Sequence, residues 1–402
     1  MTIVLVNDSC SVNGGTAAVA IEEAVGLSNA GFAVHFFGVT GPVDARLATA
    51  GVQVHCSDRP SFLDDPDRLG AAARGWWNFE EAARFRQLLR ALDPKTSIVH
   101  IHGWMKALSP AIFHTAWTAG FRVVTTLHDY FLSCPNGAFL EHPTRRICTR
   151  KPLSRSCISC NCDPRSRGQK FWRVGRGFVQ EYIARAAERT SGFLAVSKFS
   201  LEKLRDKIPA ECPVDVVQNP LNLAPPEKPA GDPGGPLLFV GRLSPEKGAM
   251  IFAEAVAETG RSAVILGDGP QGDRLRESYP QLDFRGWVDP AEVRRWMTVA
   301  SGLVFPSIWY ETNGLVVAEA MAHGLPVYVS EGTAACEFVR DGVTGFRFPM
   351  GSVAGLVERL QSSRDMAFEV GRRAFDWYWA EPWTTESHVT RIIDFYRRIL
   401  NE

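Results

Sequence analysis

Short apolar stretches alternate with amphipathic ones along the whole chain. Residues 2–6 (TIVLV) predict a strand, residues 16–29 a helix with apolar positions at helical spacing, and residues 32–39 a second strand. The same order returns in the second half, where LLFV at 237–240 precedes a turn, a helix and an apolar run at 262–267. Strands that alternate with helices indicate parallel sheets, so we expect an α/β protein with two Rossmann-like domains.

A segment rich in Pro and Gly, residues 219–236, separates the two halves and predicts a hinge. We therefore expect an N-terminal, acceptor-side domain over 1–222 and a C-terminal domain over 223–380. Ligands of open parallel sheets bind beyond the carboxyl ends of the strands. Two such domains facing each other would place both sets of loops around one cleft.

Composition and charge narrow the class of protein. The chain has 402 residues, 45% of them hydrophobic, and no net charge, which is typical of a soluble globular enzyme. The N-terminus lacks the basic and apolar regions of a signal peptide, and no apolar run approaches the roughly 18 residues of a membrane span. We therefore expect a cytoplasmic protein whose nine cysteines are reduced thiols or metal ligands.

The neutral total conceals a basic segment, residues 145–176, within a cysteine-rich loop expected over 134–176. Between Glu141 and Arg176 the chain has ten Lys or Arg and only two acids. With its Phe and Trp residues this segment suits the anionic inner face of a membrane, where lipid-linked acceptors lie. Contact with an acidic glycan is one alternative, and an aromatic stripe packed on the segment's own domain is another. We expect no nucleic-acid partner, because no reading module accompanies the charge.

The stretch GRLSPEKG, residues 241–248, places two cations beside a predicted helix start. Ser244 and Pro245 have the residue types of a helix cap and a first helical position. Arg242 and Lys247 therefore flank a helix N-terminus, where the macrodipole repels cations. This arrangement fits a site for a diphosphate, which Arg contacts bidentately and Lys contacts as a point charge. The alternative is that Arg242 and Lys247 are ordinary surface cations of a solvated turn.

A second stretch, residues 305–327, combines a strand end, a loop acid and a helix start. Glu311 falls in the loop, and Glu319 interrupts the apolar helix that follows. A carboxylate in such a helix is unfavourable unless it is hydrogen-bonded, and hydroxyl groups of a sugar or ribose would supply those bonds. Partial exposure is the alternative explanation. The helix start would also direct unpaired backbone amides toward an anion, those of Gly314, Leu315 and Val316.

These stretches together resemble the family 4 retaining glycosyltransferases, which have the GT-B fold. The resemblance rests on GRLSPEKG, GDGP at 267–270, FRGWV at 284–288, and the pair Glu311 and Glu319 before AMAHGLPV. It covers most of the second half and, more loosely, the first. It implies two Rossmann-like domains that face each other across a cleft, with a C-terminal helix, 381–402, that returns to the first domain.

The resemblance also implies roles for single residues. Arg242 and Lys247 would bind the diphosphate of the donor. Glu319 would bind its ribose, and Glu311 the sugar that is transferred. His128, which ends the predicted strand VVTTLH, matches the active-site histidine that contacts this sugar. Three parts of the backbone would also contact the donor. Gly14 and Gly15 would form a glycine loop at the phosphates, and Gly269 and residues 285–288 would border the nucleobase. The amides of Gly314, Leu315 and Val316 would bind the distal phosphate.

The implied activity is the transfer of a sugar, with retention, from a nucleoside-diphosphate sugar to a saccharide or lipid-linked acceptor, in polysaccharide or glycolipid synthesis. The leaving phosphate would take the acceptor's proton, so we expect neither an enzymic base nor a divalent metal in catalysis. Asn313 departs from the aromatic or small residue often found there, which leaves the donor-sugar pocket undefined.

Two other functions fit parts of the same sequence. One is a catalytically silent protein that binds sugar nucleotides. The other is an NAD-dependent oxidoreductase, because Gly267, Gly269 and Gly272 satisfy G-x-G-x-x-G. That pattern follows the second strand of its domain rather than the first, and no acid about 20 residues further on clearly ends a strand.

Five of the nine cysteines gather between residues 134 and 162. Cys157 and Cys160 have the spacing of one arm of a structural zinc site, and Cys134 and Cys148 would form the other arm, at an unusually wide spacing. Cys162 would then be spare. A zinc ion would hold together a long loop that lacks regular structure. An iron–sulfur cluster, or thiols without a metal, are the alternatives.

Overall fold

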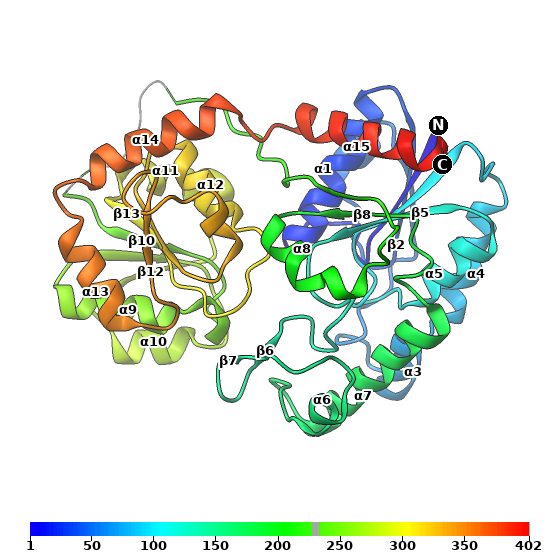
Figure 1. The fold of residues 1–402 in the computed structure, drawn as a ribbon, viewed down its shortest axis with the longest axis horizontal. Coiled ribbons are helices and arrows are strands. Elements are labelled where there is room, and N and C mark those ends of the chain that lie inside the picture. The colour runs from blue at the N-terminus through cyan, green and yellow to red at the C-terminus, as the bar shows by residue number, and fades with distance from the viewer. Residues whose placement is uncertain (227–231, 233, 402) are drawn as a thin grey trace. The chain divides into compact units, whose positions relative to one another are not determined.

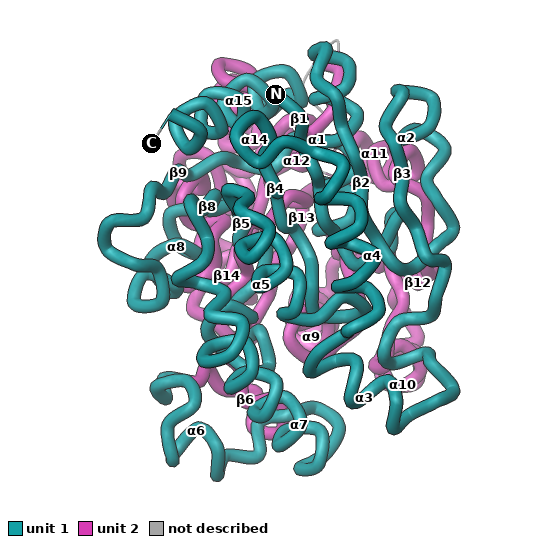
Figure 2. The backbone as a smooth tube through the Cα atoms, turned by 90° about the vertical axis from the view of Figure 1, so that its right-hand side faces the viewer, with its two compact units in different colours: residues 1–138, 149–220, 383–402 teal, residues 139–148, 221–382 magenta. Residues whose placement is uncertain are grey.

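The computed structural model describes residues 1–226, 232 and 234–401. It divides into two compact units (Figure 2): unit 1 comprises residues 1–138, 149–220 and 383–402, and unit 2 comprises residues 139–148 and 221–382. The predicted hinge, 219–236, lies partly outside the described residues. In the described ranges, every helix is too short or too polar to cross a bilayer.

Unit 1 contains a seven-stranded parallel sheet in the order β3-β2-β1-β4-β5-β8-β9 (Figure 2). Strand β1 lies between β2 and β4 and pairs with them at Thr2↔Ala33 and Thr2↔Ser97. Its strands are nearly continuous apolar runs because helices cover both faces of a parallel sheet. The strands are β1 (Thr2–Val6), β2 (Ala33–Gly38), β3 (Gln53–Cys56), β4 (Ser97–Ile101), β5 (Arg122–Leu127), β8 (Gly192–Ala195) and β9 (Val214–Val216).

The last helix of the chain packs in unit 1, against the first (Figure 1). At Gly26 the two helices approach so closely that a Cβ atom would lie 2.7 Å from a methyl group of Val389. The helices of unit 1 are α1 (Gly15–Asn29), α2 (Ala45–Thr49), α3 (Arg68–Trp76), α4 (Phe79–Leu89), α5 (Ala111–Thr118), α6 (Arg155–Ser159), α7 (Arg167–Phe178), the π-helix η1 (Val179–Ala184), α8 (Lys198–Leu204), the 3-10 turn η2 (Arg205–Lys207) and α15 (Thr385–Asn401).

Unit 2 contains a six-stranded sheet in the order β12-β11-β10-β13-β14-β15, again parallel, and the short antiparallel pair β6 and β7. The strands are β6 (Leu140–Glu141), β7 (Arg146–Ile147), β10 (Leu237–Val240), β11 (Ala263–Leu266), β12 (Asp283–Gly286), β13 (Gly302–Phe305), β14 (Val327–Ser330) and β15 (Phe346–Phe348). The helices and 3-10 turns are η3 (Pro245–Lys247), α9 (Ala249–Thr259), α10 (Gly272–Ser278), α11 (Pro290–Val299), α12 (Leu315–Ala322), η4 (Ala334–Glu337), α13 (Val353–Ser362) and α14 (Ala367–Ala380).

The helix predicted to start at Ser244 and Pro245 is a short 3-10 helix. Ser244 is the N-cap and Pro245 the first residue of η3, the Ser244 hydroxyl donates to Glu246 Oε1 at 2.6 Å, and the α-helix α9 starts only at Ala249. Gly248 separates the two because it has a φ of 74°, and a Cβ atom there would lie 2.0 Å from the Pro306 carbonyl oxygen. The loop after β10 is therefore held against the end of β13.

Candidate functional site

An ion pair joins the loops after β10 and β13 in unit 2. Lys247 Nζ lies 2.9 Å and 2.7 Å from the two carboxylate oxygens of Glu311. Lys247 ends the η3 turn, and Glu311 lies in the loop that follows β13. The sequence places both residues near one ligand but does not indicate that they contact each other, because 64 positions separate them.

Two more donors surround the carboxylate of Glu311. Trp309 Nε1 donates to Oε2 at 2.8 Å, and the Ser307 hydroxyl donates at 3.3 Å. Lys247 Nζ also lies 5.4 Å from the centroid of the Trp309 ring. The result is an oriented ammonium group that can bind an anion, beside a carboxylate that can accept hydrogen bonds from hydroxyl groups.

Helix α12 begins at Leu315, four residues after Glu311. Gly314 is its N-cap, and Leu315 and Val316 are its first helical residues. The amides of a first helical turn have no acceptor within the helix, so they can donate to an anion. The predicted helix start at Gly314 is therefore present, on the same loop as the ion pair.

Glu319 lies in the second turn of α12, with 18% of its side chain exposed. Burial raises the pKa of Glu319, and the guanidinium of Arg294, 4.0 Å away, offsets part of this shift. None of the described residues donates a hydrogen bond to its carboxylate oxygens. Such a carboxylate can accept hydrogen bonds from a ligand's hydroxyl groups.

Arg242 is exposed and forms no ion pair with any described residue. The loops after β10 and β11 pack closely against each other. A Cβ atom on Gly267 would lie 2.0 Å from the Gly241 carbonyl oxygen, and a Cβ atom on Gly269 would lie 2.5 Å from the Leu243 carbonyl oxygen. The first two glycines of the dinucleotide pattern therefore have a packing reason, which weakens the oxidoreductase alternative.

Unit 1 carries its predicted residues at the carboxyl ends of β1 and β5. A Cβ atom on Gly14 or Gly15, at the start of α1, would have no described atom within 4 Å. His128 directly follows β5, and its Nε2 atom lies 2.9 Å from His102 Nδ1. Burial holds the pKa of His128 well below its usual value, so its imidazole is neutral at pH 7.

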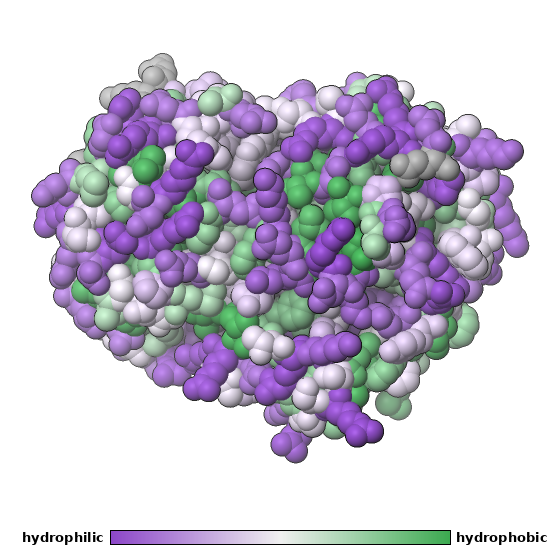
Figure 3. Space-filling view, in the orientation of Figure 1, coloured by the Kyte–Doolittle hydropathy of each residue, from purple (hydrophilic) through white to green (hydrophobic). Residues whose placement is uncertain are grey.

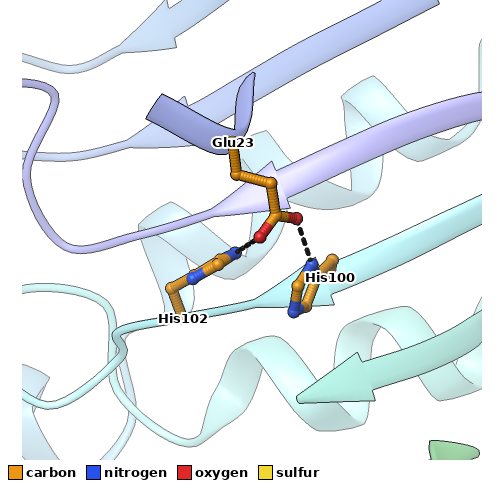
Figure 4. A group of neighbouring side chains, drawn as sticks. All are labelled: Glu23, His100 and His102. Carbon is orange, nitrogen blue, oxygen red and sulfur yellow. Dashed lines mark hydrogen bonds and ion pairs between the residues drawn. The ribbon is translucent and has the colours of Figure 1, made fainter. Parts of the chain in front are cut away.

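Glu23, His100 and His102 form a cluster that the sequence did not indicate (Figure 4). The Glu23 carboxylate on α1 lies 2.8 Å from His100 Nδ1 and 3.6 Å from His102 Nε2, at the end of β4. These residue types could also hold a metal ion, since their ligand atoms lie within 4.8 Å of one another. The signals in the sequence were H-x-H in the strand SIVHIH and an acid among the apolar positions of helix 16–29.

The cysteine-rich loop contains a buried lysine that the sequence did not indicate. Lys170 Nζ lies 3.6 Å from Cys157 Sγ and 3.3 Å from Cys162 Sγ. Burial opposes a charged ammonium, but the two sulfur atoms outweigh burial and raise the pKa of Lys170. Cys134 Sγ donates to Asn136 Oδ1 at 3.0 Å in the same loop. Cys162, expected to be spare, therefore belongs to this cluster, and the predicted zinc ligands stay a prediction.

Part of the basic segment is buried. Arg173 Nε lies 2.9 Å from Asp163 Oδ2, and Arg176 donates to the Met105 carbonyl oxygen at 2.9 Å. With Lys170 they are held inside unit 1 and cannot serve an external anion. Exposed cations remain near α6 and α7, at the lower edge of Figures 1 and 3, where hydrophilic side chains protrude beside apolar ones; these are Lys151, Arg155, Arg165 and Arg167.

The aromatic stripe along α7 and η1 is divided between interior and surface. Val174 and Ala186 are buried, as packing of the stripe on its own domain requires. Phe171, Phe178 and Tyr182 are instead 57%, 39% and 65% exposed. Three of the five residues of the stripe are thus available to a partner.

Comparison with known proteins matches both halves of the chain. Residues 13–224 match the model of Glycosyltransferase Family 4, and residues 235–363 match that of glycosyl transferases group 1. The chain is 32% identical over 189 residues to phosphatidyl-myo-inositol mannosyltransferase of Mycobacterium leprae, over 43% of this chain and 50% of that protein. It is 28% identical over 184 residues to sulfoquinovosyl transferase SQD2 of Arabidopsis thaliana, which covers 42% of this chain and 36% of that protein. The matches thus span half or less of these relatives' lengths.

Solved structures resemble the whole chain. The structure of Anabaena HepE in complex with UDP-glucose superposes with a TM-score of 0.68 at 17% identity, over 99% of this chain and 100% of that one. Sucrose-phosphate synthase from Thermosynechococcus elongatus gives a TM-score of 0.69 at 16% identity, over 100% and 99%. Because the family 4 model matches more than half of the chain, and two parallel α/β units underlie these similarities, the chain belongs to glycosyltransferase family 4 and has the GT-B fold.

Proposed function

We propose that the chain transfers a sugar, with retention, from a nucleoside-diphosphate sugar to a saccharide or lipid-linked acceptor. The observation that carries this proposal is the Lys247–Glu311 ion pair on the same loops as the first turn of α12. One small region of unit 2 thus offers an ammonium group, unpaired amides and a carboxylate. A sugar diphosphate needs donors for its phosphates and acceptors for its hydroxyl groups, and this region has both.

In this proposal Lys247, Arg242 and the amides of 314–316 bind the diphosphate. Glu311 accepts from the hydroxyl groups of the transferred sugar, and Glu319 from those of the ribose. The bond between the anomeric carbon and the phosphate oxygen breaks, and the acceptor oxygen bonds to the same face of that carbon. The leaving phosphate takes the acceptor's proton. The main task of the protein is then to stabilise the negative charge that develops on the phosphate.

For unit 1, we propose that Gly14, Gly15 and His128 contact the donor. The open space at Gly14 and Gly15 admits a phosphate group close to the backbone at the start of α1. The neutral imidazole of His128 can exchange hydrogen bonds with a sugar hydroxyl without adding charge. Gly269 and residues 285–288 are proposed to border the nucleobase.

Donor binding followed by turnover tests the proposal. Purified protein is screened by thermal shift against a panel of nucleotide sugars, and release of the nucleoside diphosphate is then measured with the best donor, without and with candidate acceptors. A catalytically silent binding protein would show the thermal shift and no release. An oxidoreductase would respond to NAD and to none of the nucleotide sugars.

The curated relatives support a lipid-linked acceptor only by analogy, because one of them is named for phosphatidyl-myo-inositol. The exposed residues of α6, α7 and η1 support the same idea independently. Cations of Lys151, Arg155, Arg165 and Arg167 lie in the segment that also exposes Phe171 and Tyr182. We propose that this surface binds the protein reversibly to anionic lipids on the inner face of a membrane.

We also propose that Cys134, Cys148, Cys157 and Cys160 hold a structural zinc ion. Cys134 and Cys157 are buried, and the ammonium of Lys170 close to Cys157 favours a thiolate there. Metal analysis of the purified protein tests this: about one equivalent of zinc is expected, and Cys157→Ser should lower it while Cys336→Ser, in unit 2, should not. Iron in place of zinc, or no metal at all, would contradict the assignment.

A further inference from the structure

A buried carboxylate in unit 1 connects the first helix, a central strand and the last helix. Glu23 on α1 is 1% exposed. Its Oε1 atom lies 2.8 Å from His100 Nδ1 of β4 and accepts from the Tyr396 hydroxyl of α15 at 3.0 Å. Its Oε2 atom lies 3.3 Å from His388 Nε2, also on α15. Burial alone would raise the pKa of Glu23, but His100 and His102 hold it well below its usual value.

The hydrogen-bond partners assign the protons of this cluster. His388 Nδ1 lies 2.8 Å from the Gln218 carbonyl oxygen, which can only accept. Its Nε2 atom faces an ionised carboxylate, which also can only accept. The two ring nitrogens of His388 thus face two acceptors, and these contacts hold Glu23 against α15. Burial lowers the pKa of His100 to about 4, so that ring is neutral.

The contacts continue through His102 to His128. One ring nitrogen of His102, Nε2, faces the Glu23 carboxylate, which can only accept, and the other, Nδ1, faces a ring nitrogen of His128. The 3.6 Å distance from Nε2 to Glu23 is longer than a hydrogen bond, and no described residue forms a hydrogen bond with this nitrogen, so it is the negative charge of Glu23 that favours a proton there (Figure 4). His102 Nδ1 then accepts from His128 Nε2 at 2.9 Å.

We propose that Glu23 is a positioning residue for His128, acting through His102. By fixing the proton on His102 Nε2, Glu23 places the proton of His128 on Nε2 and leaves Nδ1 as its acceptor. Because His388 and Tyr396 hold Glu23 in place, the last helix of the chain takes part in preparing a residue at the end of β5. This inference rests on the proposed function, in which His128 contacts the transferred sugar.

The expected size of the effect follows from what His128 does. Removing the acid that orients a catalytic triad histidine lowers kcat by about 10⁴, because the wrong tautomer cannot move the proton. In the proposed reaction His128 moves no proton. We therefore expect Glu23→Gln to lower kcat by roughly tenfold to a hundredfold, as removal of an orienting partner does at other sites, with KM changed less than twofold.

The experiment combines NMR of the intact chain, labelled with ¹⁵N-histidine, with steady-state kinetics. In the wild type, His128, identified by its loss in His128→Gln, should carry its proton on Nε2. In Glu23→Gln this preference should disappear and kcat should fall. Glu81→Gln, which removes another buried carboxylate of unit 1, should change neither.

A second variant separates positioning from a general loss of structure. In His102→Asn the side-chain amide can turn either its oxygen or its nitrogen toward His128, and nothing connects it to Glu23, so this variant should lower kcat by a similar factor. The double variant should then be no worse than either single one. Additive losses, an unchanged tautomer in Glu23→Gln, an unchanged kcat, or a metal ion copurifying on Glu23, His100 and His102 would each overturn the proposal. If the wild type turned over no nucleotide sugar, the proposed function would fail, while the NMR result would still show whether Glu23 sets the His128 proton.

Discussion

The most informative contact at the scale of single residues is the one between Lys247 and Glu311. A lysine and a glutamate that are partly buried and paired at 2.7 Å are oriented before any ligand arrives. The same loops leave Arg242 without an ion pair among the described residues. We infer that the pair is arranged for a ligand that carries both negative charge and hydroxyl groups.

Removing either cation should therefore slow turnover far more than it affects the fold. Loss of one group that stabilises developing negative charge reduces kcat by about 10²–10³, or roughly 2.7–4 kcal/mol. We expect Lys247→Ala and Arg242→Ala to show such losses in diphosphate release, with unchanged thermal unfolding. Lys95→Ala, at an exposed lysine of unit 1, is the matched control. Near-normal turnover in both variants would refute the diphosphate assignment.

Asp129, the residue after His128, should make stability depend on pH. Burial raises the pKa of Asp129 from 3.8 to about 6, although its Oδ1 atom accepts from the Phe131 amide at 2.9 Å. The pKa of Asp129 is higher in the folded than in the unfolded protein, so the folded state holds this proton more tightly. The stability that this group contributes is therefore fully present below the unfolded pKa and is lost as the pH rises through about 6.

The variant Asp129→Asn should remove this dependence. Near pH 7.5 its free energy of unfolding, measured in urea, should exceed that of the wild type by about 1–2 kcal/mol. This is less than the full pKa shift would give, because the Asp129 side chain is partly exposed. Near pH 4 the two proteins should differ little. A wild-type-like decrease with rising pH in Asp129→Asn would show that another group is responsible.

At the scale of elements, the parallel sheets could be predicted and the side-chain clusters could not. Strands such as 2–6 and 237–240 are short apolar runs followed by glycine turns, and the structure has β1 and β10 there. The split at Gly248 could not be predicted, because it depends on the carbonyl of Pro306, far along the chain. The Glu23 cluster brings together three segments of unit 1, which no local pattern indicates.

The packing of α15 on α1 gives a test at this scale. Gly26→Ala would place a methyl group 2.7–2.8 Å from side-chain methyls of Val389 and Thr385. The overpacking, about 1–3 kcal/mol, should outweigh the roughly 0.5–1 kcal/mol that Ala gains over Gly in a helix. Gly168→Ala in α7 has its nearest neighbour at 3.8 Å and should be neutral or stabilising. Equal melting temperatures for the two variants would contradict the close packing of α15.

At the scale of the whole molecule, the chain has no net charge but an exposed basic and aromatic surface in unit 1. Of the ten cations between Glu141 and Arg176, Lys170, Arg173 and Arg176 are held inside the unit, which the sequence could not indicate. Burial of these three reduces the number available to a membrane. The surface of α6, α7 and η1 still combines exposed cations with exposed aromatic side chains, the two features that favour binding to an anionic membrane surface.

Binding to vesicles tests this surface. The wild type should sediment with vesicles that contain anionic lipids and be released by high salt, since each cation near the surface contributes about 1 kcal/mol. Replacing Arg155, Arg165 and Arg167 by Glu should weaken binding by about 100-fold or more. The same change at Arg90, Lys95 and Arg122 should have little effect. Sedimentation that changes neither with salt concentration nor with the charge of the lipids would exclude the membrane proposal.

The central claim is that Lys247 and its neighbouring loops in unit 2 bind the diphosphate of a sugar nucleotide. Calorimetric titration of wild type and Lys247→Ala with the nucleoside diphosphate of the best donor measures this directly. We predict a 1:1 complex for the wild type and an affinity at least tenfold weaker for Lys247→Ala, with the fold unchanged by circular dichroism. Equal affinities for the two proteins, or no binding of any nucleoside diphosphate to the wild type, would contradict the account.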